Sequence, residues 1–385
     1  MHIRQSILRS WASSYFPTLR GLSSILNVLT KATWAKSSPT LHRILSFPRV
    51  PVHGKVGEGF EYEFIQVPPG DEPEELETDV VIIGSGCGGG VAAKNFTDAG
   101  HSVIVVEKSH HWPANYLPMT MTDGSMHLFM DNGAINSDDA NILTVAGSAW
   151  GGGGTVNWSA SLQTQGFVRE EWASQGLPFF TSAEYQNSLD RICARMGVSA
   201  DHIEHNKTNR VLLEGAHNLG WTAKPVPQNT GGRQHYCGYC TLGCGSCEKQ
   251  GPVVSFLPDA ARDGAKFMEG FDVQKILFHN EHGKRVAIGV EGEWTSRDEY
   301  RGVKGERYKR QVIIRAKKVV VSCGTLQSPL LLQRSGLKNP HIGKNLKLHP
   351  VSHVGAIYEE EVRPWEGKEL APVSIQSPLY KTKSC

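Results

Sequence analysis

The fold is decided by residues 80–89, which read VVIIGSGCGG. The four apolar residues predict a buried strand, and the glycines after it open a helix that continues through Asn95. Gly84 allows a tight turn, Gly86 lets the backbone approach a pyrophosphate at the positive end of the helix, and Gly89 lets helix and strand pack closely. This stretch therefore predicts a dinucleotide site in a Rossmann-like unit.

A second predicted strand, Ser102 to Val106, strengthens this interpretation because it ends on Glu107. Glu107 lies about 20 residues after the first glycine, as the fingerprint requires, and its carboxylate is placed to accept hydrogen bonds from ribose hydroxyls. The glycine pattern alone would be weak support for a dinucleotide site. Two strands, the glycines, the helix and the terminal Glu107 together are specific for one. Residues 317–327, an apolar run broken by Ser-Cys-Gly-Thr, predict a third strand returning beside the nucleotide.

Both NAD-binding and FAD-binding proteins contain this fingerprint, and a second glycine-rich stretch distinguishes between the two cofactors. Residues 147–157 read GSAWGGGGTVN. Bulky and apolar residues stand on both sides of the four glycines, which argues against a flexible linker. We interpret this backbone as running against a flat ligand that leaves no room for Cβ atoms. The sequence therefore predicts FAD.

At these residues the chain resembles the GMC (glucose–methanol–choline) oxidoreductases and, within them, the long-chain (fatty) alcohol oxidases of fungi. The matching segments are 79–94, 147–165, 235–254 and 322–350. The resemblance implies an α/β fold (α+β overall), in which a Rossmann-like FAD-binding domain of the GMC type carries an inserted, partly helical substrate domain.

The resemblance also implies which residues bind FAD. They are Gly84, Ser85, Gly86, Cys87, Gly88, Gly89, Glu107, Gly151, Gly152, Gly153, Thr155, Asn157, Val273 and Gly324. Among them, the glycines of the first turn hold the pyrophosphate, Glu107 holds the ribose, and the segment from Gly151 to Asn157 lines the isoalloxazine ring. Val273 is expected to contact the adenine through its backbone.

The activity implied by the resemblance is oxidation of long-chain primary alcohols to aldehydes, with O2 as acceptor and H2O2 as product. In the family a histidine base removes the hydroxyl proton while a hydride passes to the flavin. That histidine belongs to a C-terminal region beyond the last matching motif, so we assign no catalytic residue and expect a truncated chain. Another GMC alcohol or sugar dehydrogenase and an inactive FAD-binding fragment stay open as alternatives.

Four cysteines, Cys237, Cys240, Cys244 and Cys247, follow His235 with the spacing C-x2-C-x3-C-x2-C. Thiolates at this spacing can converge on one metal ion or cluster. Free thiols on a glycine-rich loop and a pair of disulfides are the alternatives.

The N-terminal arm contains no acidic residue before Glu58. Its basic residues are Arg4, Arg9, Arg20, Lys31, Lys36, Arg43, Arg49 and Lys55. Apolar residues from Ile7 to Leu29 recur at helical spacing, which predicts an amphipathic helix suited to an anionic membrane surface. A helix docked on the rest of the protein and a mitochondrial transit peptide are the alternatives.

The composition indicates which partners and which compartment to expect for the protein. A net charge of +2 gives no reason to expect nucleic acid as a partner, and no apolar run is long enough to span a membrane. No secretory signal is visible, which favours a reducing compartment. We therefore expect a membrane-associated intracellular protein, with the peroxisome as one candidate location.

We predict five segments along the chain. They are an arm and linker (1–77), the first part of the FAD-binding domain (78–165), a helical and loop insertion with the cysteines (166–265), the second part of the FAD-binding domain (266–350), and the start of a truncated substrate domain (351–385).

Overall fold

The computed structural model describes residues 2–38, 40–44, 51, 55–139, 141–235, 238–297, 307–349, 355–356, 358–363 and 373–376. The chain divides into two compact units, residues 1–53 and residues 54–385. The larger unit contains both glycine-rich segments and the cysteine-containing segment.

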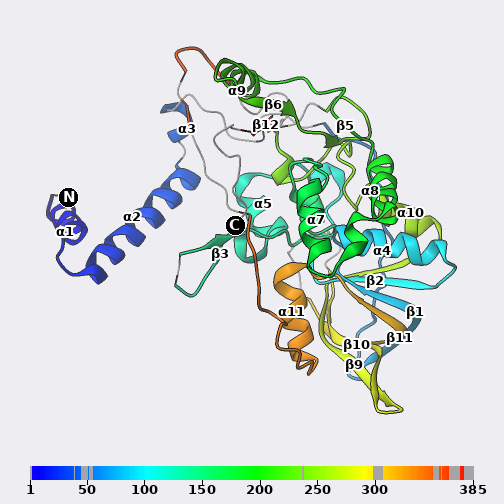
Figure 1. Ribbon diagram of the computed structural model, residues 1–385. Helices are drawn as coiled ribbons and strands as arrows, with labels where there is room; N and C mark the ends of the chain where they lie inside the picture. Colours follow the sequence, from blue (N-terminus) through cyan, green and yellow to red (C-terminus); the bar gives the residue numbers. More distant parts are fainter. Residues whose placement is uncertain are drawn as a thin grey trace. The chain divides into compact units, whose positions relative to one another are not determined.

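A six-stranded sheet carries the core of the larger unit (Figure 1). Its strands are β1 (Glu74–Ile83), β2 (Val103–Glu107), β8 (Lys266–Glu269), β9 (Phe271–Glu281), β10 (Lys284–Thr295) and β11 (Lys309–Val321). Their order is β8-β2-β1-β11-β10-β9. The first four of these are parallel to one another, whereas β10 and β9 continue the sheet in antiparallel fashion. The predicted Rossmann-like α/β fold is confirmed.

The apolar runs of β1 and β2 fill both faces of this sheet. Val80 and Ile82 belong to one hydrophobic cluster, and Val81 and Ile83 belong to another on the opposite face. Side chains alternate between the faces of a strand, and helices cover both faces of a parallel sheet. A continuous apolar run is therefore what a central parallel strand requires.

Three helices accompany the sheet. They are α4 (Cys87–Asp98), which connects β1 to β2, α10 (Phe256–Arg262), which packs beside α4, and α11 (Gly324–Arg334), which follows β11. The third strand that the sequence predicts near residue 317 is the end of β11, and it pairs directly with β1.

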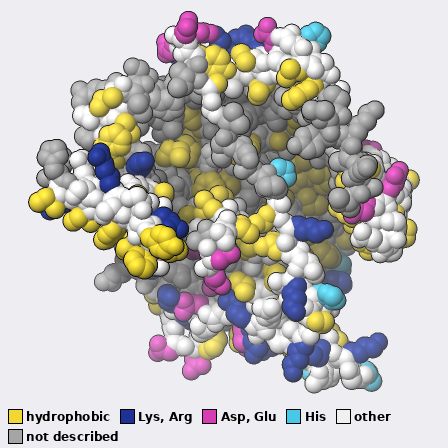
Figure 2. Space-filling view, turned by 60° about the vertical axis from the view of Figure 1, so that its left-hand side comes forward, with side chains coloured by type: hydrophobic (Ala, Val, Ile, Leu, Met, Phe, Trp, Pro, Cys, Tyr) yellow, Lys and Arg dark blue, Asp and Glu magenta, His cyan; other side chains and the backbone are white. Residues whose placement is uncertain are grey.

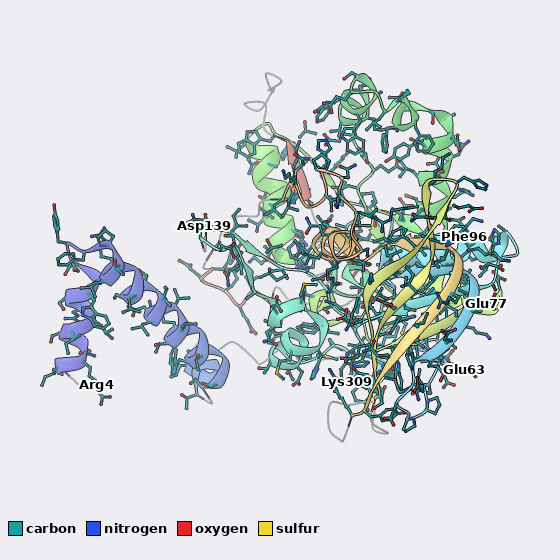
Figure 3. The ribbon with its side chains drawn as sticks, turned by 90° about the horizontal axis from the view of Figure 1, so that it is seen from below. Arg4, Glu63, Glu77, Phe96, Asp139 and Lys309 are labelled. Atoms are coloured by element: carbon teal, nitrogen blue, oxygen red, sulfur yellow. The ribbon has the colours of Figure 1, made fainter. Side chains whose placement is uncertain are left out.

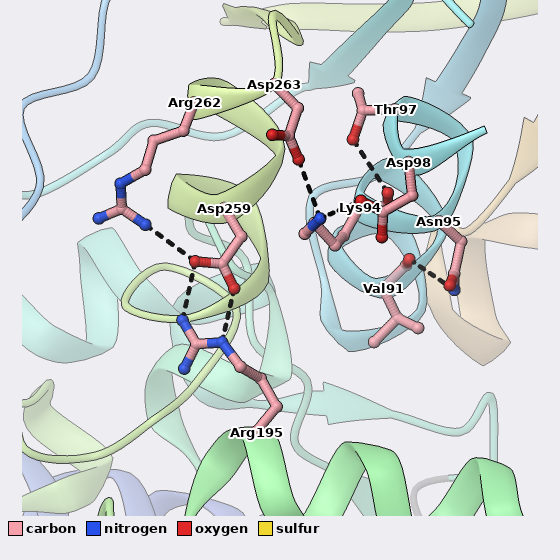
Figure 4. A network of polar contacts seen from close by, with 9 residues as sticks. All are labelled: Val91, Lys94, Asn95, Thr97, Asp98, Arg195, Asp259, Arg262 and Asp263. Carbon is pink, nitrogen blue, oxygen red and sulfur yellow. Dashed lines mark hydrogen bonds and ion pairs between the residues drawn. The ribbon is translucent and has the colours of Figure 1, made fainter. Parts of the chain in front are cut away.

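Charged side chains tie α4 and α10 to helix α8 (Ala183–Met196) (Figure 4). The guanidinium of Arg195 donates two hydrogen bonds to Asp259, at 2.5 and 2.9 Å, and Arg262 donates a third at 2.8 Å. Lys94 of α4 donates to Asp263 at 2.9 Å. Burial opposes ionisation of Asp259, but the Arg195 hydrogen bond together with the charges of Arg195, Arg262 and Lys94 lowers the pKa of this carboxyl. The network fixes the inserted helices against the nucleotide-binding unit.

The further helices of the larger unit are α5 (Met121–Leu128), α6 (Gly153–Val156), α7 (Gly166–Ser174) and α9 (Lys207–Asn218), with short 3-10 turns η1 (Ala114–Tyr116), η2 (Met130–Gly133), η3 (Pro178–Thr181) and η4 (Cys240–Leu242). Short antiparallel pairs join β3 (Ile135–Asn136) to β4 (Leu143–Thr144), β5 (Val198–Ser199) to β7 (Gln228–Asn229), and β6 (Thr222–Pro225) to β12 (Val373–Gln376).

The N-terminal unit contains α1 (His2–Ala12), α2 (Pro17–Ser37) and α3 (Leu41–Ile44). The single amphipathic helix predicted here is divided, because Pro17 begins a new helix after a break at residues 13–16. Within the unit, the buried Ser23 hydroxyl donates to the Leu8 carbonyl at 3.2 Å and joins α1 to α2. Arg4 of α1 is exposed (Figure 3).

Candidate functional site

A cavity of about 350 Å³ lies at the carboxyl ends of β1 and β2, where open α/β sheets bind their ligands. Its wall combines the turn after β1, the first residues of α4, the segment 147–153, the start of β9 and the start of α11. The predicted cofactor residues that line it are Gly84, Gly86, Cys87, Gly88, Glu107, Gly152, Gly153, Val273 and Gly324.

Glycine is required in the turn after β1 for two different reasons. Gly84 has a φ of +102°, and a Cβ on it would lie 2.3 Å from the Ser322 carbonyl oxygen. A Cβ on Gly89 would lie 1.9 Å from the Gly84 carbonyl oxygen, so helix and strand touch here. Gly89 itself does not line the cavity. Cys87 and Gly88 begin α4 and line the cavity, so the backbone N–H groups of the first helical turn are available to an anion.

Glu107 is oriented by hydrogen bonds from two serines. Its Oε2 accepts from the backbone N–H and the hydroxyl of Ser85, at 3.1 and 2.9 Å, and its Oε1 accepts from the Ser109 backbone at 3.0 Å. The Ser85 hydroxyl in turn accepts from the Gly151 N–H at 2.9 Å. Ser85 is fully buried and does not line the cavity. It joins the first glycine turn, the acidic residue and the second glycine-rich segment.

The second glycine-rich segment is held closely by protein neighbours. A Cβ on Gly151 would lie 2.3 Å from Val253, and one on Gly154 would lie 2.4 Å from Pro252. Gly153, in contrast, has no atom within 4 Å of its Cβ position and lines the cavity. Of the four glycines, Gly152 and Gly153 line the first cavity, whereas protein side chains lie against Gly151 and Gly154. The close approach of a flat ligand stays a prediction.

Thr155 and Asn157 take other positions. The Thr155 hydroxyl donates to the Trp150 carbonyl at 2.6 Å, and its residue lines a second cavity. Asn157 is exposed, and its amide oxygen accepts from the Ser159 backbone at 3.2 Å.

Trp150 anchors this segment, although the sequence offered no specific signal for its role. The side chain is 1% exposed and contacts the rings of Tyr62, Phe64 and Phe267. An aromatic cluster of this kind contributes to stability through both buried area and ring geometry. Trp150 therefore fixes where the four glycines begin.

The remaining wall of the first cavity includes residues that the sequence analysis missed. Lys108 and Arg334 bring positive charge, and Met130 and Gln327 also line it. Lys108 directly follows Glu107 and could have been inferred from that position, whereas Arg334 had no local signal. Burial, together with the Glu107 carboxylate, raises the pKa of the Cys323 thiol to about 11.

The second cavity, of about 450 Å³, lies beside the same glycine-rich segment. Ala149 lines both cavities, and Gly154 and Thr155 line only the second. Other walls come from residues 56–61, from the loop 111–117 and from the segment that carries Cys244 and Cys247.

The cysteine run is only partly described, because Cys237 lies outside the described residues. Cys244 and Cys247 are free thiols, and among the described residues no group of three or more His, Cys, Asp or Glu side chains is arranged to hold a metal ion. His235 is buried, with Nδ1 2.6 Å from Glu248 Oε2. For the whole run, a metal site, free thiols and disulfides therefore all stay predictions.

The family model of the GMC oxidoreductases matches residues 125–351, more than half of the chain. The chain belongs to this family. The resemblance predicted from the sequence is confirmed, and membership indicates FAD as the cofactor.

Several curated proteins are similar to this member of the family. The long-chain-alcohol oxidases FAO4B and FAO1 of Arabidopsis thaliana are 36% identical over 306 residues and 34% identical over 298 residues, which is 78% and 76% of this chain. Mitochondrial choline dehydrogenase of Mus musculus is 24% identical over 73% of the chain and 49% of its own length. The chain spans 39% of the length of FAO4B and 38% of that of FAO1.

A solved structure of an FAD-dependent oxidoreductase from Chaetomium thermophilum, in complex with a small fragment, is also similar. It aligns with a TM-score of 0.46 at 17% sequence identity, covering 68% of this chain and 48% of the other.

Proposed function

We propose that the chain forms the FAD-binding part of an enzyme that oxidises long-chain primary alcohols to aldehydes, with O2 as the electron acceptor and H2O2 as the product. The observation that carries this proposal is the 36% identity to a long-chain-alcohol oxidase over 306 residues. The GMC family model matches residues 125–351, which include the second glycine-rich segment and the cysteine-containing segment, and this supports an oxidoreductase acting on alcohols.

The first cavity fits FAD in its chemistry. We propose that the first turn of α4 binds the pyrophosphate, because a helix N-terminus attracts anions, and that Lys108 and Arg334 add positive charge. A carboxylate has about four lone-pair sites, and Glu107 uses three of them within the protein, so one is left for a ribose hydroxyl. Open space beside Gly153 and Gly324 leaves room for a ligand against the backbone.

Bound FAD would supply the acceptor for a hydride from the alcohol carbon. The protein must then remove the hydroxyl proton, a task that suits a neutral imidazole. His349 is exposed, and His353 lies outside the described residues. We assign the base to neither of them, and we propose, as the family resemblance implies, that the base is a histidine outside the matched segments.

The test is the visible absorption spectrum of the purified full chain, recorded before and after adding dodecanol without oxygen. A flavin spectrum that bleaches, and that returns with H2O2 when air is admitted, supports the proposed oxidase. Bleaching with glucose but not with dodecanol would favour another GMC dehydrogenase. Bound flavin that no alcohol bleaches would mean that this chain binds FAD but lacks the catalytic base. Failure of the chain to bind FAD would contradict the proposal.

We also propose that the N-terminal unit binds an anionic, intracellular membrane surface. Large apolar side chains of α1 and α2 are exposed, including Ile3, Ile7, Ile25, Val28 and Leu29, whose exposed fractions range from 45% to 76%. Hydrophobic and basic side chains are exposed together on the face of the molecule in Figure 2. An apolar face flanked by positive charge is typical of helices that lie in the membrane interface. Among the described residues, no helix is both long and apolar enough to cross a bilayer.

A further inference from the structure

Lys249 is a buried lysine that joins the cysteine-containing loop to the second glycine-rich segment. The residue is 3% exposed. Its ammonium donates hydrogen bonds to the carbonyl oxygens of Thr155 and Asn157, both at 2.8 Å, and to that of Cys240 at 3.2 Å. A lysine ammonium has three donors, and all three have acceptors here. The contacts therefore fit the positively charged form of the side chain.

This charge is held by backbone carbonyl groups. Among the residues described by the structure, no carboxylate oxygen lies within 4.0 Å of the Lys249 ammonium. The adjacent Glu248 is engaged elsewhere, with Lys55 at 2.7 Å and His235 at 2.6 Å. A positive charge that carbonyl dipoles solvate, without an adjacent anion, keeps its electrostatic effect on other nearby groups.

Lys249 lines the second cavity, and its hydrogen bonds connect it to the segment that borders the first. The carbonyls of Thr155 and Asn157 mark the C-terminal end of α6, and α6 begins at Gly153, which lines that cavity. Cys87 lines the same cavity. The Cys87 sulfur lies 3.0 Å from the Cβ position of Gly154, in the helix whose end accepts from Lys249. Burial of the sulfur raises the pKa of this thiol, and the positive charge of Lys249 acts in the opposite direction.

We propose that Lys249 is a positioning residue that holds the glycine-rich segment in place and, through its positive charge, favours the reduced form of the bound flavin. The inference rests on the proposed function for the identity of the cofactor. Hydride transfer from an alcohol delivers two electrons and one proton, and the hydroxyl proton goes to a base. The flavin ring system thereby gains one negative charge. A buried cation nearby stabilises that charge, which is one of the ways in which proteins tune flavins.

The first experiment compares the reduction potential of FAD bound to the full chain in four forms. Lys249→Gln keeps donors for the carbonyl groups but removes the charge, and Lys249→Arg keeps the charge. Lys55→Gln is the matched control, because the Lys55 side chain is 73% exposed and pairs with Glu248, the residue before Lys249. We expect Lys249→Gln to lower the equilibrium constant for two-electron reduction about tenfold, which corresponds to about 30 mV. In Lys249→Arg and Lys55→Gln, the equilibrium constant for reduction should stay within about threefold of that of the unsubstituted chain, which corresponds to about 15 mV.

The second experiment needs no FAD. The rate at which iodoacetamide alkylates Cys87 is followed against pH by peptide mass spectrometry. Cys87 lines the first cavity, and its thiolate is the reactive form. We expect Lys249→Gln to move the titration of Cys87 to higher pH, whereas Lys249→Arg and Lys55→Gln should leave it in place.

The two readouts separate the inference from the function on which it rests. An unchanged potential in FAD-loaded Lys249→Gln overturns the inference, even if the protein is an alcohol oxidase. If no form binds FAD, the proposed function fails, and the Cys87 titration still decides where the charge acts. A shift in Lys249→Gln would then support the placement of the charge beside the cavity, and no shift would overturn it.

Discussion

At the scale of single residues, neighbouring atoms determine what each glycine can tolerate. A methyl group on Gly89 would meet the Gly84 carbonyl oxygen at 1.9 Å, whereas one on Gly153 would meet nothing within 4 Å. We expect Gly89→Ala to lower the free energy of unfolding by about 3 kcal/mol, because neither backbone can move aside cheaply. Gly153→Ala should leave stability nearly unchanged but weaken FAD binding, because its methyl group would project into the cavity. Urea unfolding and FAD titration measure the two effects.

Gly215 supplies the matched control for this pair. It lies within α9, its Cβ position is open, and its φ is not in the left-handed region. Gly215→Ala should therefore raise the free energy of unfolding by about 0.5–1 kcal/mol, because alanine favours helix. Equal stability of the Gly89 and Gly153 variants would show that the contact between α4 and β1 does not limit the fold.

Individual residues also show why only part of the site could be predicted from the sequence. Gly84 and Glu107 lie in one continuous motif, so local spacing was enough to identify them. The neighbours of Gly151 and Gly154 are Val253 and Pro252, about a hundred residues away in the chain, and local sequence does not report such contacts. The role of Lys249 was not predicted for the same reason, since its hydrogen-bond acceptors come from two other segments.

At the scale of elements, a buried ion pair attaches the loop after β2 to the sheet. Arg297 and Glu269 are 9% and 8% exposed and lie 3.0 Å apart. Glu269 accepts from the His111 backbone N–H at 2.7 Å, and Arg297 donates to the His111 carbonyl at 2.7 Å. We expect Glu269→Ala to lower the free energy of unfolding by about 3–5 kcal/mol, because it leaves a buried guanidinium without its anion.

Two comparisons test this interpretation of the pair by urea unfolding. Glu293→Ala removes the partner of Lys309, whose side chain is 64% exposed, and should cost less than about 1 kcal/mol. The double variant Glu269→Ala, Arg297→Met should be less destabilised than the sum of its single variants, since the unpaired charge is gone. Additive effects would argue against direct coupling of the two side chains.

The cysteine-containing loop depends on Glu248, which predicts a pH effect. Burial by itself would raise the pKa of Glu248, but hydrogen bonds with Lys55 and His235 overcome it and leave the pKa below its ordinary value of 4.5. The unfolded chain then binds a proton more readily, so the stabilisation is complete above about pH 4.5 and is lost as the pH falls further. The difference in unfolding free energy between the unsubstituted chain and Glu248→Gln should therefore shrink between pH 6 and pH 3. A difference that stays constant over this range would contradict the assignment.

Elements of the nucleotide-binding unit were predictable because their signals are local and agree with one another. The apolar parts of β1 and β2, residues 80–83 and 103–106, are uninterrupted, and glycines stand where α4 begins. The break between α1 and α2 was missed because the apolar spacing continues across it, whereas Pro17 decides where the second helix starts.

At the scale of the whole molecule, the chain contains two compact units with different surfaces. The larger unit buries its apolar residues around a sheet and encloses the proposed cofactor site. The N-terminal unit leaves many of its apolar residues exposed and has no acidic side chain. Exposed apolar surface rimmed by charge of one sign is typical of an interaction site. An apolar substrate dissolves in membranes, so a membrane surface would bring the enzyme to its substrate.

This association predicts that the full chain binds vesicles of phosphatidylcholine and phosphatidylserine, and that salt weakens the binding, because each basic residue near an anionic surface contributes about 1 kcal/mol. Glutamate in place of Leu22, Ile25 and Leu29 together should reduce the vesicle-bound fraction at least tenfold in a sedimentation assay. The control places glutamate at Val211, Leu212 and Leu219, which are exposed in and just after α9, and it should bind as the unsubstituted chain does. If the first variant also binds normally, the N-terminal unit does not contact lipid. If it loses thermal stability while vesicle binding is absent in every form, these side chains dock on protein instead.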